Sequence, residues 1–173
     1  PNHSNAYNNL GIAHNKLSLT NKAKQFIEKS IKINPNNFYS YNNLGIVYDN
    51  IYNTKKAKEN FNKAIKINPN FTEAWWNLHC CSKTVDEALK ILEKLYEIDK
   101  NHIKAKIIIS ALKGYNGDLS DYKNLMSSED YSHPFARSID WIFSLKKLPK
   151  LFFNKWDFYD SVIDLTQKKR PFY

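Results

Sequence analysis

The chain has 173 residues and a formal net charge of +9, from 26 Lys and Arg residues against 17 Asp and Glu residues. Four glycines and six prolines are too few for an all-β fold with many tight turns. No apolar run approaches the roughly 20 residues that a membrane-spanning helix needs, so no membrane partner is expected. The basic balance is compatible with an acidic partner, but the lysines are scattered among many asparagines, which favours compositional bias over a nucleic-acid site.

The two cysteines are adjacent in sequence, at Cys80 and Cys81. Neighbouring cysteines cannot form a normal disulfide without strain, and the chain has no third cysteine to serve as a partner. Free thiols are typical of a reducing compartment. The sequence therefore predicts a cytoplasmic location.

An internal repeat of 34 residues is the strongest signal in the sequence. The run NNLGI at 8–12 recurs at 42–46, and the run IKINPN at 31–36 recurs at 65–70. Agreement over two full periods indicates a structural unit of this length, because stacked repeats are built from identical helix pairs.

Each unit reads as two helices. In the second unit the first helix carries Tyr41, Leu44 and Gly45 on one face, and the second helix carries Ala57 and Phe61. Small residues let the two helices approach closely, and the aromatic rings fill the space between them. A proline such as Pro69 ends the second helix of the unit.

The units follow one another along the chain with decreasing regularity. Residues 1–3 are interpreted as the end of a preceding repeat, since Pro1-Asn2 matches the close of the later units, and we expect this chain to be part of a longer protein. The first repeat is assigned to 4–37, the second to 38–71 and a shortened third to 72–102, in which Thr84 or Asp86 caps the second helix.

The last third of the chain departs from the pattern. A degenerate fourth unit is assigned to 103–136, with its turn at Gly117-Asp118 and its final proline at Pro134. Two amphipathic helices are expected in 137–173. They are interpreted as a cap over the last exposed apolar face or, alternatively, as a linker to a further domain.

The order aromatic, Leu-Gly, Tyr, Ala, Phe, Ala and Pro within 34 residues resembles the tetratricopeptide family. The match is strong for 4–37 and 38–71, although His14 replaces a usual Tyr, Ile27 a usual Phe and Ser30 a usual Ala. The resemblance implies an all-α fold, a right-handed α-α superhelix (a solenoid of tetratricopeptide repeats) with C-terminal capping helices.

The resemblance also implies a concave groove lined by the first helix of each pair, which binds an extended peptide or a partner helix. Carried over by position, the candidate peptide-binding residues are Asn5, Asn8, Asn9, Ile12, Lys16, Tyr39, Asn42, Asn43, Ile46, Asp49, Glu73, Trp76, Asn77 and Cys80.

One column of asparagines, Asn9, Asn43 and Asn77, recurs at intervals of 34 residues within this set. A side-chain amide offers both a donor and an acceptor, so stacked amides could hold the backbone of an extended chain. This column is similar to the asparagine ladder of O-linked N-acetylglucosamine transferase. Alternatively, the amides bond nearby main-chain groups.

The family's clamp for acidic C-terminal tails uses basic residues at positions that here hold Asn8, Glu73 and Asn77. Only Asn43 fits that clamp, so recognition of an acidic tail in this way is not expected. This comparison argues for a different kind of partner.

The sequence thus predicts a protein-protein interaction scaffold that is not an enzyme, with no catalytic residue, cofactor or metal. The cluster His79-Cys80-Cys81 is the only metal candidate, and helical geometry points its side chains in different directions. The alternative function is a substrate-presenting or assembly segment of a larger enzyme of glycosyltransferase, methyltransferase or sulfotransferase type. RNA or DNA binding is the least favoured function, and self-association is a further possibility.

Overall fold

The computed structural model describes residues 3–116 and 126, which contain seven α-helices and no strand. The all-α prediction is confirmed for these residues. The chain forms two compact units, residues 1–81 and 82–173, which are described separately below. The second helix of the predicted fourth repeat and the predicted helices of 137–173 lie outside the described residues.

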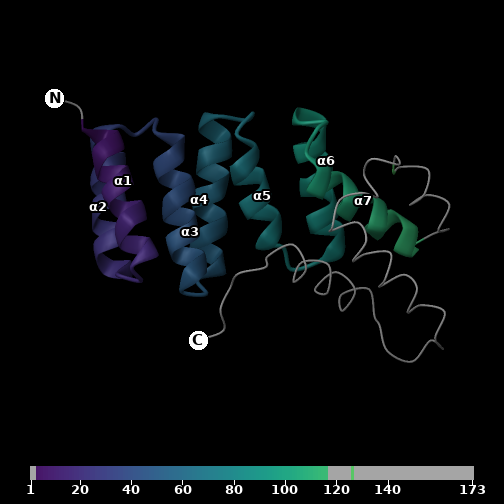
Figure 1. Cartoon of the computed structure of the whole chain (residues 1–173), viewed down its shortest axis with the longest axis horizontal. Coiled ribbons are helices and arrows are strands. Elements are labelled where there is room, and N and C mark those ends of the chain that lie inside the picture. The colour runs from purple at the N-terminus through teal and green to yellow at the C-terminus, as the bar shows by residue number, and fades with distance from the viewer. Residues whose placement is uncertain (1–2, 117–125, 127–173) are drawn as a thin grey trace. The chain divides into compact units, whose positions relative to one another are not determined.

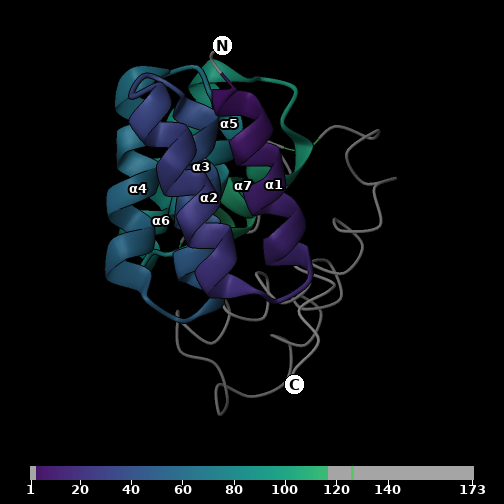
Figure 2. The same ribbon diagram turned by 90° about the vertical axis from the view of Figure 1, so that its left-hand side faces the viewer.

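The first unit stacks helices in pairs. Helix α1 (Ser4–Lys16) packs on α2 (Thr20–Ile33), α3 (Phe38–Asn50) packs on α4 (Thr54–Ile67), and α5 (Thr72–Cys80) follows. The first helices α1, α3 and α5 succeed one another along this unit, with α2 and α4 packed against them (Figure 1; Figure 2 shows the pairs from the N-terminal end).

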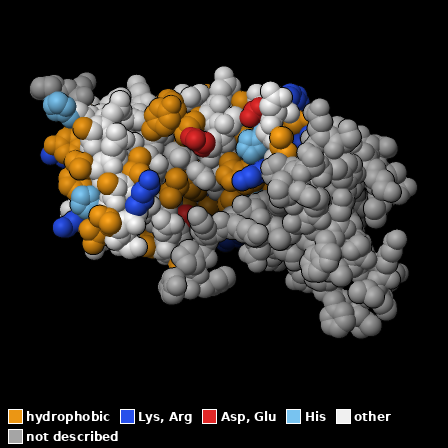
Figure 3. Space-filling model, viewed as in Figure 1, with side chains coloured by type: hydrophobic (Ala, Val, Ile, Leu, Met, Phe, Trp, Pro, Cys, Tyr) orange, Lys and Arg blue, Asp and Glu red, His pale blue; other side chains and the backbone are white. Residues whose placement is uncertain are grey.

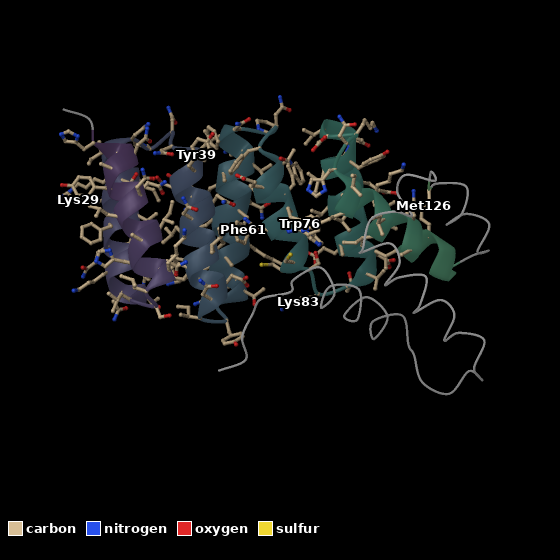
Figure 4. All side chains as sticks on the ribbon, in the orientation of Figure 1. Lys29, Tyr39, Phe61, Trp76, Lys83 and Met126 are labelled. Carbon is tan, nitrogen blue, oxygen red and sulfur yellow. The ribbon has the colours of Figure 1, made fainter. Side chains whose placement is uncertain are left out.

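Two glycines allow the paired helices to approach closely. A Cβ atom built on Gly11 would lie 2.3 Å from Ile27 Cγ1, and one built on Gly45 would lie 2.5 Å from Phe61 Cε1. Real Cβ atoms do not tolerate such distances. Both Ile27 and Phe61 are fully enclosed, and Figure 4 marks Phe61 on α4. The third repeat has His79 in place of the glycine. Its first helix, α5, is also shorter, with nine residues against thirteen in α1 and α3.

The junction between the first two pairs holds a buried hydrogen-bond network. The Ser30 hydroxyl donates to the Ser4 carbonyl oxygen (2.8 Å) and shares a hydrogen bond with the Ser40 hydroxyl (2.7 Å). The Asn37 amide nitrogen donates to the Ser4 hydroxyl (3.0 Å), and the Asn37 amide oxygen caps α3 by accepting from the Ser40 N–H (3.3 Å). Ser30, which reads in the sequence as a simple replacement for Ala, therefore links the two repeats.

The tight turn inside each of the first two pairs contains one residue in the left-handed backbone region. These residues, Ser18 (φ 59°) and Tyr52 (φ 58°), occupy equivalent positions. A left-handed conformation is unfavourable for a bulky side chain. The Tyr52 side chain is 87% exposed, so little packing within the chain offsets this strain.

We expect the substitution Tyr52→Asn to raise the free energy of unfolding by about 0.5–1 kcal/mol, because asparagine tolerates the left-handed region far better than tyrosine. Urea unfolding of the full chain measures the change. The control Tyr52→Phe keeps the strain and should leave the midpoint unchanged, whereas a lower midpoint for Tyr52→Asn would show that the tyrosine makes a stabilising contact.

The second unit begins with α6 (Val85–Ile98) and α7 (Ile103–Asn116). Thr84, rather than Asp86, caps α6, since its hydroxyl oxygen accepts from the Glu87 N–H (3.2 Å). The Lys113 ammonium and the Glu93 carboxylate, 2.7 Å apart, join the two helices at their surface. Helix α6 lies within the residues assigned to the third repeat, and α7 lies within the residues assigned to the fourth.

Candidate functional site

Asparagine side chains connect consecutive first helices to one another. The Asn43 amide nitrogen donates to the Asn8 amide oxygen (3.0 Å), and one repeat later the Asn77 amide nitrogen donates to the Asn42 amide oxygen (2.9 Å). The repeated asparagines thus bond each other across the repeats, an arrangement that neither of the two sequence interpretations included. Each donor amide keeps its oxygen and its second N–H.

The first helices line an open hollow of about 400 Å³. Eight of the predicted groove residues and one unpredicted residue, Phe71, line it. The full lining is Asn5, Asn8, Asn9, Ile12, Tyr39, Asn42, Asn43, Phe71 and Glu73. Asn8 and Asn42 are buried, whereas Asn9 is exposed and its side chain makes no hydrogen bond to another described residue.

One wall of this hollow is aromatic. The Phe71 ring meets the Tyr39 ring edge-on with centroids 5.2 Å apart, and it meets Phe38 in the same way at 4.9 Å. Phe71 occupies the repeat position that Asn37 holds at the previous junction, so the polar network there is replaced by apolar contact here. Figure 4 labels Tyr39 at the start of α3.

A second hollow of about 210 Å³ adjoins the first, since Ile12 and Asn43 line both. It adds two further predicted residues, Lys16 and Ile46, together with Asn15, whose amide oxygen accepts from the Asn50 amide (3.2 Å). Asp49, Trp76, Asn77 and Cys80 are not among the residues that line either hollow. The predicted groove residues that line the two hollows therefore come mainly from the first two repeats.

Charge is distributed unequally between the two helix types of the first unit. Helices α2 and α4 together carry nine lysines and two glutamates, whereas α1, α3 and α5 together carry one lysine, one aspartate and one glutamate. Some of these lysines lie over tyrosine rings, as Lys29 does at 4.2 Å from the Tyr7 centroid. Figure 3 shows the face of the first helices as a mixture of white and orange, with few charged side chains. The hollows thus lie on the less basic face.

The two cysteines differ in their surroundings. The Cys81 thiol is buried and donates to the Asp49 carboxylate (3.8 Å), while Cys80 is half-buried. Burial, followed by the negative charge of Asp49, raises the pKa of Cys81 to about 12. Within the described residues there is no group of three His, Cys, Asp or Glu side chains that could hold a metal ion.

We expect iodoacetamide at pH 8 to modify Cys80 in the native chain and to leave Cys81 almost untouched, because only the thiolate reacts and Cys81 is enclosed and protonated. Peptide mass mapping after timed labelling measures both rates. The same reaction in urea should label both residues, and rapid native labelling of Cys81 would contradict the described burial.

The family assignment comes from comparison with known proteins. Residues 4–37 match one tetratricopeptide repeat model, and residues 26–59 match another. Residues 4–59 therefore belong to the tetratricopeptide-repeat family. The predicted family and superhelical fold class are confirmed, and both matches fall within α1–α4. No curated protein sequence matches the chain.

Solved structures share this tetratricopeptide fold. YrrB, described as having an unusual peptide-binding site, is 18% identical with a TM-score of 0.62, over 94% of this chain and 86% of YrrB. The first repeat domain of Spaghetti, bound to the HSP90 peptide SRMEEVD, is 18% identical with a TM-score of 0.59, over 65% of this chain and 92% of that domain. The Thermobaculum terrenum O-GlcNAc transferase is 15% identical with a TM-score of 0.57, over 70% of this chain but 24% of the transferase.

These similarities to solved structures establish the fold. Within the described residues, none of the helices of the tetratricopeptide protein is long and apolar enough to cross a membrane.

Proposed function

We propose that this tetratricopeptide protein is a scaffold that binds an extended segment of a partner protein along α1, α3 and α5. The observation that carries the proposal is the hollow of about 400 Å³, to which three consecutive first helices or their leading turns contribute amide, aromatic and aliphatic side chains. Most of these lining side chains are polar, and such a set suits the N–H and C=O groups that a peptide backbone presents.

The amides suit an extended backbone. A peptide in this conformation presents alternating N–H and C=O groups, and each asparagine amide offers a donor and an acceptor. Asn9 keeps all of its hydrogen-bonding capacity, and Asn43 keeps its oxygen and one N–H after its bond to Asn8. Because the bond to Asn8 fixes the orientation of Asn43, less side-chain freedom remains to be lost on binding.

Peptide selection tests the proposal. A phage-displayed library of random dodecapeptides is selected for binding to the full chain. The selected peptides are then synthesised, and their affinities are measured by fluorescence polarisation. Asn9→Ala should weaken binding about fivefold, the value of a typical hydrogen bond. The matched control Asn21→Ala removes an exposed amide from α2, outside both hollows, and should change nothing.

Asn9 is changed and Asn43 and Asn77 are kept, because the amides of the latter two also form hydrogen bonds between repeats. Removing those amides could lower both the stability of the chain and its affinity for the peptide. Failure to select any peptide, or equal effects of Asn9→Ala and Asn21→Ala, would contradict binding in this groove.

A second candidate is a non-catalytic segment of a larger enzyme that presents its substrate. The similarity to the Thermobaculum terrenum O-GlcNAc transferase, over 24% of that protein, favours it. Sequencing the parent gene beyond the codon for Tyr173 provides the test. An adjoining transferase domain would support this candidate, and an immediate stop codon would count against a C-terminal enzyme domain.

A further inference from the structure

The larger hollow contains a single charged residue. Of the nine residues that line it, Glu73 alone is ionisable at neutral pH, and the others are five asparagines, one isoleucine and two aromatics. Glu73 is exposed and makes no ion pair with another described residue. Lys16, the one charged residue of the smaller hollow, does not line the larger one.

The position of Glu73 also has a simpler explanation. It lies in the first turn of α5, where an acidic side chain is favoured by the helix dipole. That explanation accounts for a carboxylate at this end of the helix, but it does not account for the aromatic side chains that line the same hollow. The equivalent residues of the earlier repeats are Asn5 and Tyr39, so the acidic group is specific to this place in the stack.

The aromatic wall supplies the second half of a cation site. Tyr39, with 51% of its surface exposed, and Phe71 line the hollow together with Glu73. Figure 3 shows hydrophobic and acidic side chains adjoining over the start of α3 and α5. Aromatic faces attract ammonium and guanidinium groups, and a carboxylate supplies the counter-charge. Together these groups have the chemistry that recognises a lysine or arginine side chain.

We propose that the larger hollow binds an arginine or lysine side chain of the partner peptide, with the Glu73 carboxylate as its counter-charge and Tyr39 and Phe71 as its aromatic walls. The inference rests on the proposed function and adds the chemistry of the partner. A bound peptide of this kind is opposite in charge to SRMEEVD, the acidic peptide bound by the Spaghetti domain.

The experiment uses dodecapeptides selected on the full chain, as above, and compares variants of both partners. Selected peptides should share a basic residue, and replacing that residue with alanine should weaken binding roughly tenfold. Glu73→Gln should weaken binding of the unaltered peptide by a similar factor. Its matched control, Glu59→Gln, removes an exposed carboxylate from α4, outside both hollows, and should leave affinity unchanged.

Exchanging the charges of residue 73 and of the peptide distinguishes loss of charge recognition from structural damage to α5. Glu73→Lys should bind the original peptide poorly and recover affinity for a peptide whose basic residue is replaced by glutamate. Recovery in this exchange supports the inference. Peptides that bind without a basic residue, or equal effects of Glu73→Gln and Glu59→Gln, would overturn it while leaving the proposed function standing. Failure to select any peptide would overturn both.

Discussion

The substitution Gly45→Ala is expected to lower the free energy of unfolding by up to about 2 kcal/mol. Helix propensity alone predicts the opposite sign, because alanine is favoured over glycine inside a helix by about 1 kcal/mol. The added Cβ atom would, however, lie 2.5, 2.7 and 3.0 Å from three atoms of the Phe61 ring. Overpacking a filled core costs about 1–3 kcal/mol, and the ring has little room to move since its side chain is only 1% exposed.

A double-mutant cycle with Phe61→Leu tests this explanation. Phe61→Leu alone should destabilise the chain by leaving a cavity, whereas adding it to Gly45→Ala should cost less than the sum of the two single changes. Urea unfolding of the four proteins gives the coupling free energy. Additive effects, or a stabilised Gly45→Ala protein, would show that the two helices can move apart to admit the methyl group.

The substitution Ser30→Ala is expected to destabilise the first unit by about 1–3 kcal/mol, the cost of buried polar groups that lose a partner. The change removes the donor to the Ser4 carbonyl oxygen and the hydrogen-bond partner of the Ser40 hydroxyl. It creates almost no cavity, since alanine differs only by the absent hydroxyl. Thermal unfolding followed by circular dichroism measures the loss.

The next junction supplies the control for Ser30→Ala. There the positions of Ser30 and Ser40 are occupied by Ala64 and Ala74, both fully buried. The double variant Ser30→Ala, Ser40→Ala reproduces that pair and should recover part of the lost stability, because it removes both hydroxyls of the hydrogen bond. If the double variant is less stable than Ser30→Ala, the Ser40 hydroxyl must stabilise the chain through a contact other than its hydrogen bond to Ser30.

Much of the first unit was predictable from sequence because its features repeat at a fixed interval. The helix pairs, the close packing of Gly45 and the grouping of Asn9, Asn43 and Tyr39 on the first helices all follow from positions within one repeat. A motif 34 residues long contains that information without any knowledge of the neighbouring unit.

Contacts between repeats were not predictable in the same way. The bonds from Asn43 to Asn8 and from Asn77 to Asn42 depend on how one helix pair is rotated against the next. The position of Phe71 beside the hollow depends on the same rotation, and a residue that ends one repeat gives no sequence signal for a groove. Its spacing of 33 residues from Phe38 could have suggested an aromatic pair.

The binding face of the tetratricopeptide stack can be located directly by nuclear magnetic resonance. The full chain, labelled with nitrogen-15, is titrated with a selected dodecapeptide while the side-chain amide signals of its asparagines are followed. Binding along the first helices predicts that the signals of Asn9 and Asn43 shift, while those of Asn21 and Asn62 on the lysine-rich α2 and α4 stay in place. Shifts confined to Asn21 and Asn62 would contradict the proposed groove.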